Sequence, residues 1–135
     1  MIDRAIEAEA VPACLKYGLS VAPYIPLAQG VLTGKYRRGE AVPPDTRAWN
    51  NPSGLIERYM TDANLDLVEK LDRWAQEHGH RVAELAVAWL LAKAHICSVI
   101  TGVTRITQLE QNVKASDWTL TEEQIKAVNT MLAGA

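Results

Sequence analysis

Apolar residues recur at helical spacing through much of the second half of the chain. From Thr61 to about His78 they stand three or four positions apart, at Leu65, Val68, Leu71 and Ala75. This spacing predicts an amphipathic helix, with Thr61 as its N-cap and Gly79 ending it. The segment from about Val82 to Lys93 is apolar on most faces. It therefore predicts a helix that neighbouring elements cover.

Three further helices are expected from local signals. The segment from Arg4 to Tyr17 has near-helical apolar spacing and is followed by a glycine, although Pro12 predicts a kink or a break. Another helix is expected from about Ile106 to Lys114. The last helix opens at Thr121, which forms a capping box with Gln124.

Two short apolar segments, Leu19–Ile25 and Cys97–Thr101, predict buried strands. Pro23 weakens the first because proline has no N–H to donate to a neighbouring strand. Strands and helices follow one another in an order that predicts parallel strands joined by helical crossovers, which is an α/β fold. Between the strands, Pro26 to Met60 is rich in glycine, proline and basic residues. We expect this long loop to be the least ordered part of the ligand-free chain, because it offers little burial to offset its ordering entropy.

The composition limits the class of protein. The chain has 135 residues, 48% hydrophobic and 22% charged, with a net charge of −2. These values are typical of one soluble domain, and the lack of a basic excess argues against nucleic-acid binding. The charged first residues and the lack of a long apolar run predict neither a signal peptide nor a membrane span. Cys14 and Cys97 lack metal or redox spacing, so we interpret them as buried small residues of a cytoplasmic protein.

Two segments are candidates for ligand chemistry, because parallel α/β folds bind ligands beyond the C-terminal ends of their strands. In Ile25–Tyr36, small residues let backbone amides approach a ligand, and Lys35 is suited to neutralise a phosphate. Ile100–Arg105 leads directly into a helix, whose free N–H groups and dipole favour phosphate. From the residues alone, a plain loop and a plain helix cap remain the alternative. His78 and His80 are too few for a metal site, so no metal is predicted.

These same segments resemble the aldo-keto reductase family. Residues 24–36 read Tyr-Ile-Pro-Leu-Ala-Gln-Gly-Val-Leu-Thr-Gly-Lys-Tyr, against a family pattern of aromatic-Ser-Pro-Leu-Ala-x-Gly-x-Leu-Thr/Ser-Gly-Lys-Tyr. Residues 43–47, 86–91, 99–104 and 108–112 also match family segments. The resemblance is closest to the branch of bacterial stress reductases and potassium-channel β subunits, and it covers nearly the whole chain.

The resemblance implies a site for NADPH or NADP. The residues it assigns to the pyrophosphate are Pro26, Leu27, Ala28 and Lys35, with Arg47 and Asp45 closing over it. The residues it assigns to the adenosine 2'-phosphate end and the adenine are Gly102, Thr104, Gln108, Gln111 and Asn112. Three positions depart from the family pattern: Ile25 replaces Ser, Thr101 replaces Pro, and Gln111 replaces Glu.

The resemblance also implies which part of the family fold this is. The family forms a (β/α)8 TIM barrel of typically about 250 residues or more. Residues 1–135 would form a partial domain, the C-terminal, cofactor-binding portion with two parallel strands. The catalytic Asp, Tyr, Lys and His would lie in the other half, so no catalytic residue is assigned here; Lys35 and Tyr36 match the cofactor loop instead.

The family reaction is the NADP(H)-dependent reduction of aldehydes or ketones, and we expect this chain alone to be inactive. The alternative is a truncated or degenerate, non-catalytic nucleotide-binding or structural protein. The expected partners are the cofactor, a small carbonyl substrate when the full barrel is present, and either another copy or a complementary barrel fragment.

Overall fold

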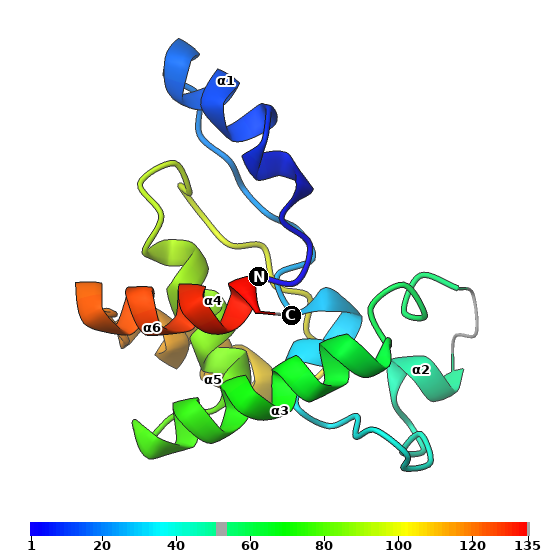
Figure 1. Ribbon diagram of the computed structural model, residues 1–135. Coiled ribbons are helices and arrows are strands. Elements are labelled where there is room, and N and C mark those ends of the chain that lie inside the picture. Colours follow the sequence, from blue (N-terminus) through cyan, green and yellow to red (C-terminus); the bar gives the residue numbers. More distant parts are fainter. Residues whose placement is uncertain (51–53, 135) are drawn as a thin grey trace.

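The computed structural model describes residues 1–50 and 54–134, and their regular structure is helical. In chain order the elements are η1 (Ala5–Glu7), α1 (Ala10–Tyr17), η2 (Ala28–Thr33), α2 (Arg47–Asn50), α3 (Asp62–Glu77), α4 (Val82–Leu91), α5 (Ile106–Lys114), η3 (Ala115–Asp117) and α6 (Glu122–Ala133). Helices α3 to α6 gather into one body, whereas α1 projects away from it (Figure 1). None of the helices in the described ranges is long and apolar enough to cross a membrane.

Helix α3 forms as its sequence pattern predicts. The Thr61 side chain accepts a hydrogen bond of 3.2 Å from the backbone N–H of Asn64, which caps the helix. The predicted apolar stripe is buried, including Leu71 and Ala75, which are fully covered. This stripe packs against α4 on one side and α6 on another. The prediction of this helix is therefore confirmed in both its position and its buried face.

Helix α4 is the centre of the core. Every residue from Leu85 to Leu90 is buried, and so is Val82. The helices η2, α3, α5 and η3 all pack against it, so the prediction of a covered helix is confirmed. The helices expected at Ile106–Lys114 and after Thr121 are also present. In the second, Thr121 and Gln124 form the predicted capping box, with hydrogen bonds of 3.0 and 3.3 Å.

The two predicted strands are wrong as elements. Among the described residues the pairing between Leu19–Ile25 and Cys97–Thr101 is reduced to one parallel bridge, between Val21 and Ile96. Three backbone hydrogen bonds join the segments there, from Val21 N to His95 O (2.7 Å), from Cys97 N to Val21 O (3.2 Å), and from Ile100 N to Pro23 O (2.9 Å). The two segments thus run parallel as predicted, but they do not form a continuous ladder of hydrogen bonds.

The loss of the strands has a physical reason. A ladder in a parallel sheet is stable when both its faces are covered and further strands flank it. Here Leu19 and Ile100 are 59% and 54% exposed, so neither segment has such cover. Pro23 also lacks the N–H that would extend the pairing. The observed arrangement is therefore a set of helices around one bridge, and the α/β description needs this correction.

The N-terminal helix is interrupted, as Pro12 predicts. A 3₁₀ turn, η1, ends at Glu7, and α1 begins at Ala10. Pro12 lies in the first turn of α1, where its missing N–H removes no helical hydrogen bond, so the break precedes the proline. Gly18 ends α1 in the left-handed conformation. The prediction of a break is confirmed, and its position is Ala8–Glu9.

The long loop is only partly what its composition suggests. Near its start, Ala28–Thr33 form η2, and Val31, Leu32 and Tyr36 are buried in the core. The expectation of little burial is therefore wrong for this stretch, because its apolar residues fill the space beside α3 and α4. From Arg37 to Asn50 the chain is mostly exposed and contains the short helix α2. The part of the predicted loop at 51–53 lies outside the described residues.

The prediction of two buried cysteines is wrong. Cys97 is exposed and Cys14 is only half-buried. Cys97 follows the bridge, and its thiol lies 3.7 Å from the carbonyl oxygen of Val21. Cys97 lies in a segment without cover, and Cys14 lies in α1, which projects away from the main body (Figure 1).

Candidate functional site

The segment that precedes and includes η2 forms a compact turn on the core. Pro26 and Ala28 are buried, and Leu27 is half-buried. The carbonyl oxygen of Leu27 accepts hydrogen bonds from the backbone N–H groups of Gly30 (2.8 Å) and Leu32 (3.1 Å). Ala28 has a φ of 47° and the next residue a φ of 59°, a conformation that is unfavourable for residues other than glycine. The apolar residues of this motif therefore hold a strained backbone turn in place.

Lys35 folds back over this turn. Its ammonium nitrogen lies 5.2 Å from the centre of the Tyr36 ring, a cation–π contact. A Cβ at Gly30 would stand 3.2 Å from the same nitrogen, so a side chain there would press on the lysine. Gly30 also has a φ of 99°, which disfavours any other residue. The glycine thus leaves room for the cation beside the turn.

Arg47 brings a second cation to the same turn from α2. Its guanidinium donates a hydrogen bond to the side-chain oxygen of Gln29. The next residue, Ala48, donates its backbone N–H to the hydroxyl oxygen of Tyr36 at 3.3 Å. Asp45, which the resemblance places with Arg47, is exposed and has a φ of 59°. The structure therefore brings Lys35 and Arg47 to adjacent positions of one turn.

The electrostatics of this cluster differ from those of its neighbours. Arg37 and Arg38 are paired with carboxylates of α3, and Arg58 is paired with Asp3. Within residues 1–50 and 54–134, neither Lys35 nor Arg47 forms an ion pair. Two exposed, unneutralised cations beside a tight turn are suited to a phosphate group.

The second predicted group lies at the start of α5. The side-chain oxygen of Gln108 accepts hydrogen bonds from the backbone N–H and the hydroxyl of Thr104, at 2.9 and 3.3 Å. Gln111 and Asn112 follow three and four positions later, so they share a helix face with Gln108. Around Gly102 there is open space, since a Cβ built there would meet no atom within 4 Å.

Helix α4 connects the two predicted groups. It packs against η2 on one side and against α5 on another. No hydrogen bond between described residues joins the first group to the second. The predicted residues therefore form two separate clusters on one scaffold, and within each cluster the contacts are direct.

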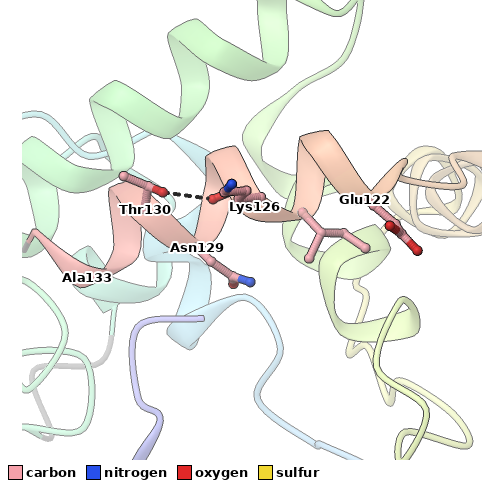
Figure 2. Close-up of a pocket in the computed structure, with 6 residues that line it drawn as sticks. Glu122, Lys126, Asn129, Thr130 and Ala133 are labelled. Carbon is pink, nitrogen blue, oxygen red and sulfur yellow. Dashed lines mark hydrogen bonds between the residues drawn. The ribbon is translucent and has the colours of Figure 1, made fainter.

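One cavity lies away from the predicted site residues, and a second is lined in part by Pro26 and Ala28. The first is a shallow hollow on α6, and all six of its lining residues come from this one helix (Figure 2). Two of them are already engaged: Thr130 donates to the carbonyl oxygen of Lys126 at 3.0 Å, and Asn129 accepts from the indole N–H of Trp89 at 3.0 Å. The hollow contains none of the predicted site residues, so we assign it no chemistry.

The second cavity, of about 460 Å³, lies between the N-terminal segment, residues 21–26 and the end of α4. Arg4 and Lys93 both lie over the Trp89 ring, with their charged groups 5.6 and 4.2 Å from its centre. A hydrogen bond from Arg4 lowers the pKa of Glu7, and burial lowers the pKa of Lys93. Pro26 and Ala28, which are predicted to hold the cofactor, help to line this cavity, whereas Lys35, Asp45 and Arg47 do not.

His78 and His80 take part in packing. The ring of His78 lies 4.0 Å from that of Trp74, and the ring of His80 stacks on Trp118 at 3.8 Å. The imidazole of His80 also contacts the Glu84 carboxylate at 3.2 Å. His80 is therefore half-buried in an aromatic stack, whereas His78 stays exposed.

The sequence reasoning missed Gln29 and Tyr36 as parts of the site. Tyr36 was assigned to the cofactor loop without a role, yet it is buried and contacts both Lys35 and Ala48. Gln29 occupies a position that the family pattern leaves unspecified, so the motif predicts no role for it. A contact between Gln29 and Arg47 spans a loop, and no local signal in the sequence encodes it.

Comparison with known proteins identifies the family. The model of the aldo/keto reductase family matches residues 1–133. The chain belongs to the aldo/keto reductase family. Within this family it is 42% identical over 113 residues to a probable voltage-gated potassium channel subunit beta from Arabidopsis thaliana, covering 83% of this chain. It is 37% identical over 120 residues to an L-glyceraldehyde 3-phosphate reductase from Escherichia coli O157:H7, covering 86% of this chain.

The match extends to the three-dimensional structure of an aldo/keto reductase relative. A glycerol dehydrogenase from Gluconobacter oxydans superposes with a TM-score of 0.73 at 27% identity, over 98% of this chain and 39% of that one. The chain spans 34% of the length of each of the two sequence relatives above. The predicted membership in the aldo/keto reductase family is therefore confirmed, and the chain matches about a third of the length of these relatives.

Proposed function

We propose that this chain binds NADP(H) and supplies the cofactor-binding part of an aldo/keto reductase that reduces aldehydes or ketones to alcohols. The observation that carries the proposal is the meeting of Lys35 and Arg47 at the η2 turn without a neutralising carboxylate among the described residues. A dinucleotide carries a pyrophosphate, and paired cations are well suited to bind such a doubly charged group.

The residues present fit the cofactor at both ends. Lys35 and Arg47 would hold the pyrophosphate over the turn built by Pro26, Leu27 and Ala28, with Asp45 beside them. The start of α5 would hold the adenosine end, where Gly102 leaves open space and Thr104 is already tied to Gln108. Gln111 and Asn112 lie on the same face of that helix, next to the expected adenine. When bound, the nicotinamide supplies hydride to the carbonyl carbon.

We also propose a preference for NADPH over NADH, which the start of α5 supports. Arg105 is its N-cap residue, is exposed, and forms no ion pair within the described part of the chain. An arginine at a helix N-terminus favours an added phosphate. One relative, 29% identical over 137 residues, is an NADH-specific methylglyoxal reductase from Escherichia coli, so a comparison of the two nucleotides is the informative measurement.

Titration of the chain with NADPH and NADH, followed by tryptophan fluorescence, tests the binding proposal. Lys35→Ala should weaken NADPH binding by roughly 1–3 kcal/mol, the scale of a charge-assisted hydrogen bond. Lys16→Ala is a matched control, because Lys16 lies over the ring of Tyr17 at 5.4 Å in the same kind of contact but on α1. Equal dissociation constants for wild type and Lys35→Ala would exclude the pyrophosphate role.

A second candidate function is nucleotide binding without catalysis. It is favoured by Ile25 and Gln111, which depart from the family pattern and remove a hydroxyl donor and a charge. Reduction of a carbonyl also needs a proton donor beside the developing alkoxide, and no residue here matches the family's tyrosine. We expect no NADPH oxidation by this chain alone with methylglyoxal or L-glyceraldehyde 3-phosphate. Turnover that survives purification and disappears in Tyr36→Phe would contradict this.

We propose a cytoplasmic location, since the exposed thiol of Cys97 is suited to a reducing compartment. The proposed partners are the nucleotide and a protein partner that covers the exposed apolar faces, either another copy of the chain or a complementary barrel fragment.

A further inference from the structure

The contact between Gln29 and Arg47 is the only side-chain hydrogen bond that joins η2 to α2 among the described residues. Gln29 belongs to the turn that the core holds in place, whereas Arg47 belongs to an exposed four-residue helix. The position of the Arg47 guanidinium is therefore set by a neutral amide on the turn. No carboxylate among the described residues competes for it.

The backbone around this contact is anchored independently. Tyr36 is 3% exposed, and its hydroxyl accepts the backbone N–H of Ala48 at 3.3 Å. The hydroxyl of Thr46 donates to the carbonyl oxygen of Pro43 at 2.7 Å, which closes the turn that leads into α2. Helix α2 is therefore attached to the turn by a contact that does not involve Gln29. The Gln29 contact fixes the Arg47 guanidinium, whereas the Tyr36 contact holds the backbone of α2.

The chemistry of the two groups makes the contact exchangeable. An amide oxygen is a neutral acceptor, and a guanidinium binds a phosphate oxygen more strongly because both partners are charged. Lys35 lies beside Gly30, the residue that follows Gln29, and adds a second positive charge at the same place. An arriving diphosphate therefore meets Lys35, which forms no ion pair with a described residue, and Arg47, which a weaker acceptor occupies.

We propose that Gln29 is a latch on Arg47: its amide oxygen occupies the guanidinium in the ligand-free protein, and a diphosphate group displaces it. This inference rests on the proposed binding of a dinucleotide. Gln29 is a positioning residue here, since it acts through Arg47. The latch lowers the affinity for the ligand, because part of the binding free energy is spent in opening it.

Two substitutions change the latch in opposite directions. Gln29→Asn keeps an amide and tolerates the φ of 59°, but it is one methylene too short to reach Arg47. It should tighten binding of inorganic pyrophosphate and NADP⁺ roughly threefold, the scale of one net hydrogen bond. Gln29→Glu keeps the length and gives Arg47 a charged partner. It should weaken binding on the order of tenfold, the scale of a hydrogen bond to a charged group.

The same substitutions in an Arg47→Ala background separate a latch from a general effect. There, Gln29→Asn should have no effect, and Gln29→Glu should weaken binding less than about threefold, through charge repulsion alone. A second measurement does not depend on the binding affinity. The side-chain N–H signal of Arg47 in NMR should be protected from water exchange in the ligand-free wild type and unprotected in ligand-free Gln29→Asn, and pyrophosphate should protect it in both proteins.

The outcomes distinguish this inference from the function on which it rests. If wild type binds NADP⁺ and Gln29→Glu has equal effects with and without Arg47, the latch is wrong and the binding site remains. If wild type binds neither NADP⁺ nor pyrophosphate, both proposals fail. Gln29→Glu keeps the side-chain length, so it carries the test even if Gln29→Asn does not fold.

Discussion

At the scale of single residues, Asp72 is a charged side chain within the apolar face of α3. It is 9% exposed and accepts hydrogen bonds from the side chain of Gln76 (2.8 Å) and the backbone N–H of Val82 (3.3 Å). Gly34 passes close beside it, and a Cβ there would lie 3.6 Å from the Asp72 carboxyl carbon. Asp72 therefore links α3, the start of α4 and the end of η2.

Replacing Asp72 should destabilise the protein. Asp72→Ala leaves the buried N–H of Val82 without a partner, which costs roughly 1–3 kcal/mol of unfolding free energy. Asp66→Ala is a suitable control, because Asp66 forms an exposed ion pair with Arg38 at 2.9 Å, and such pairs contribute less than about 1 kcal/mol. Urea denaturation measures both. A loss for Asp72→Ala no larger than the control would show that water replaces the carboxylate.

Glu7 gives stability a defined pH dependence. The hydrogen bond from Arg4 lowers its pKa below the ordinary value of 4.5. A carboxylate with a depressed pKa stabilises the folded state above its unfolded pKa, and this stabilisation is lost as the pH falls through the folded value. Glu7→Gln should therefore reduce stability at pH 7, and this loss should shrink as the pH falls below 4.5 and through the lower pKa of the folded state. Because the pair is partly exposed, we expect a loss under about 1 kcal/mol.

The measurement for Glu7 is a series of urea denaturation curves from pH 7 to pH 3. Glu9→Gln is the control, since Glu9 is exposed and forms no ion pair within the described ranges. A difference between wild type and Glu7→Gln that stays constant across the series would contradict the assigned role of the charge.

At the scale of elements, an aromatic stack joins α3 to the segment that leads into α6. Trp118 stacks on His80 with ring centres 3.8 Å apart and an interplanar angle of 8°, and its ring lies 6.2 Å from that of Trp74. Helix α6 also packs on α3. The stack therefore fixes how the C-terminal helix approaches the core.

Removal of the Trp118 ring should weaken the packing of α6 against the core. Trp118→Ala should lower the unfolding free energy by roughly 2–3 kcal/mol, through lost burial and lost ring stacking. Trp49→Ala, at a position 59% exposed on α2, should change it by less than about 0.5 kcal/mol. Chemical denaturation followed by circular dichroism compares the two. Equal effects would mean that the stack lies on the surface without contributing to the fold.

At the scale of the whole molecule, many large apolar side chains lie on the surface and outside the core. Ile106 and Val113 on α5 are 75% and 60% exposed and share one helix face with Leu109. Tyr24, beside the single bridge, is 76% exposed. Apolar surface left in water costs roughly 25 cal/mol per Å², so covering these faces is favourable.

We therefore expect the chain to self-associate, or to bind a complementary barrel fragment, at micromolar concentration. Sedimentation velocity should show dimers or larger species. Replacement of both Ile106 and Val113 by Lys should shift them toward monomer, whereas Thr107→Lys, on an exposed polar position of the same helix, should not. A compact monomer with a cooperative thermal transition would show that these faces need no partner.

The sequence by itself determined the elements whose signals are local. Helices α3, α4, α5 and α6 follow from apolar periodicity and from caps such as Thr61 and Thr121, because each depends on residues within a few positions. The motif of residues 24–36 likewise identified the family, which the comparisons confirm. The break near Pro12 follows from the geometry of a single residue.

The tertiary structure decided what depends on residues far apart. Leu19–Ile25 and Cys97–Thr101 have the composition of strands. A ladder needs neighbouring strands and covered faces, however, and the part of the chain that the structure describes has one bridge. The burial of η2, the contact of Gln29 with Arg47, and the use of Asp72 as a link depend on the way separate segments pack. Asp72 has the spacing of the α3 apolar stripe, but a periodicity gives no partner for a buried carboxylate. Only packing brings Val82 to it.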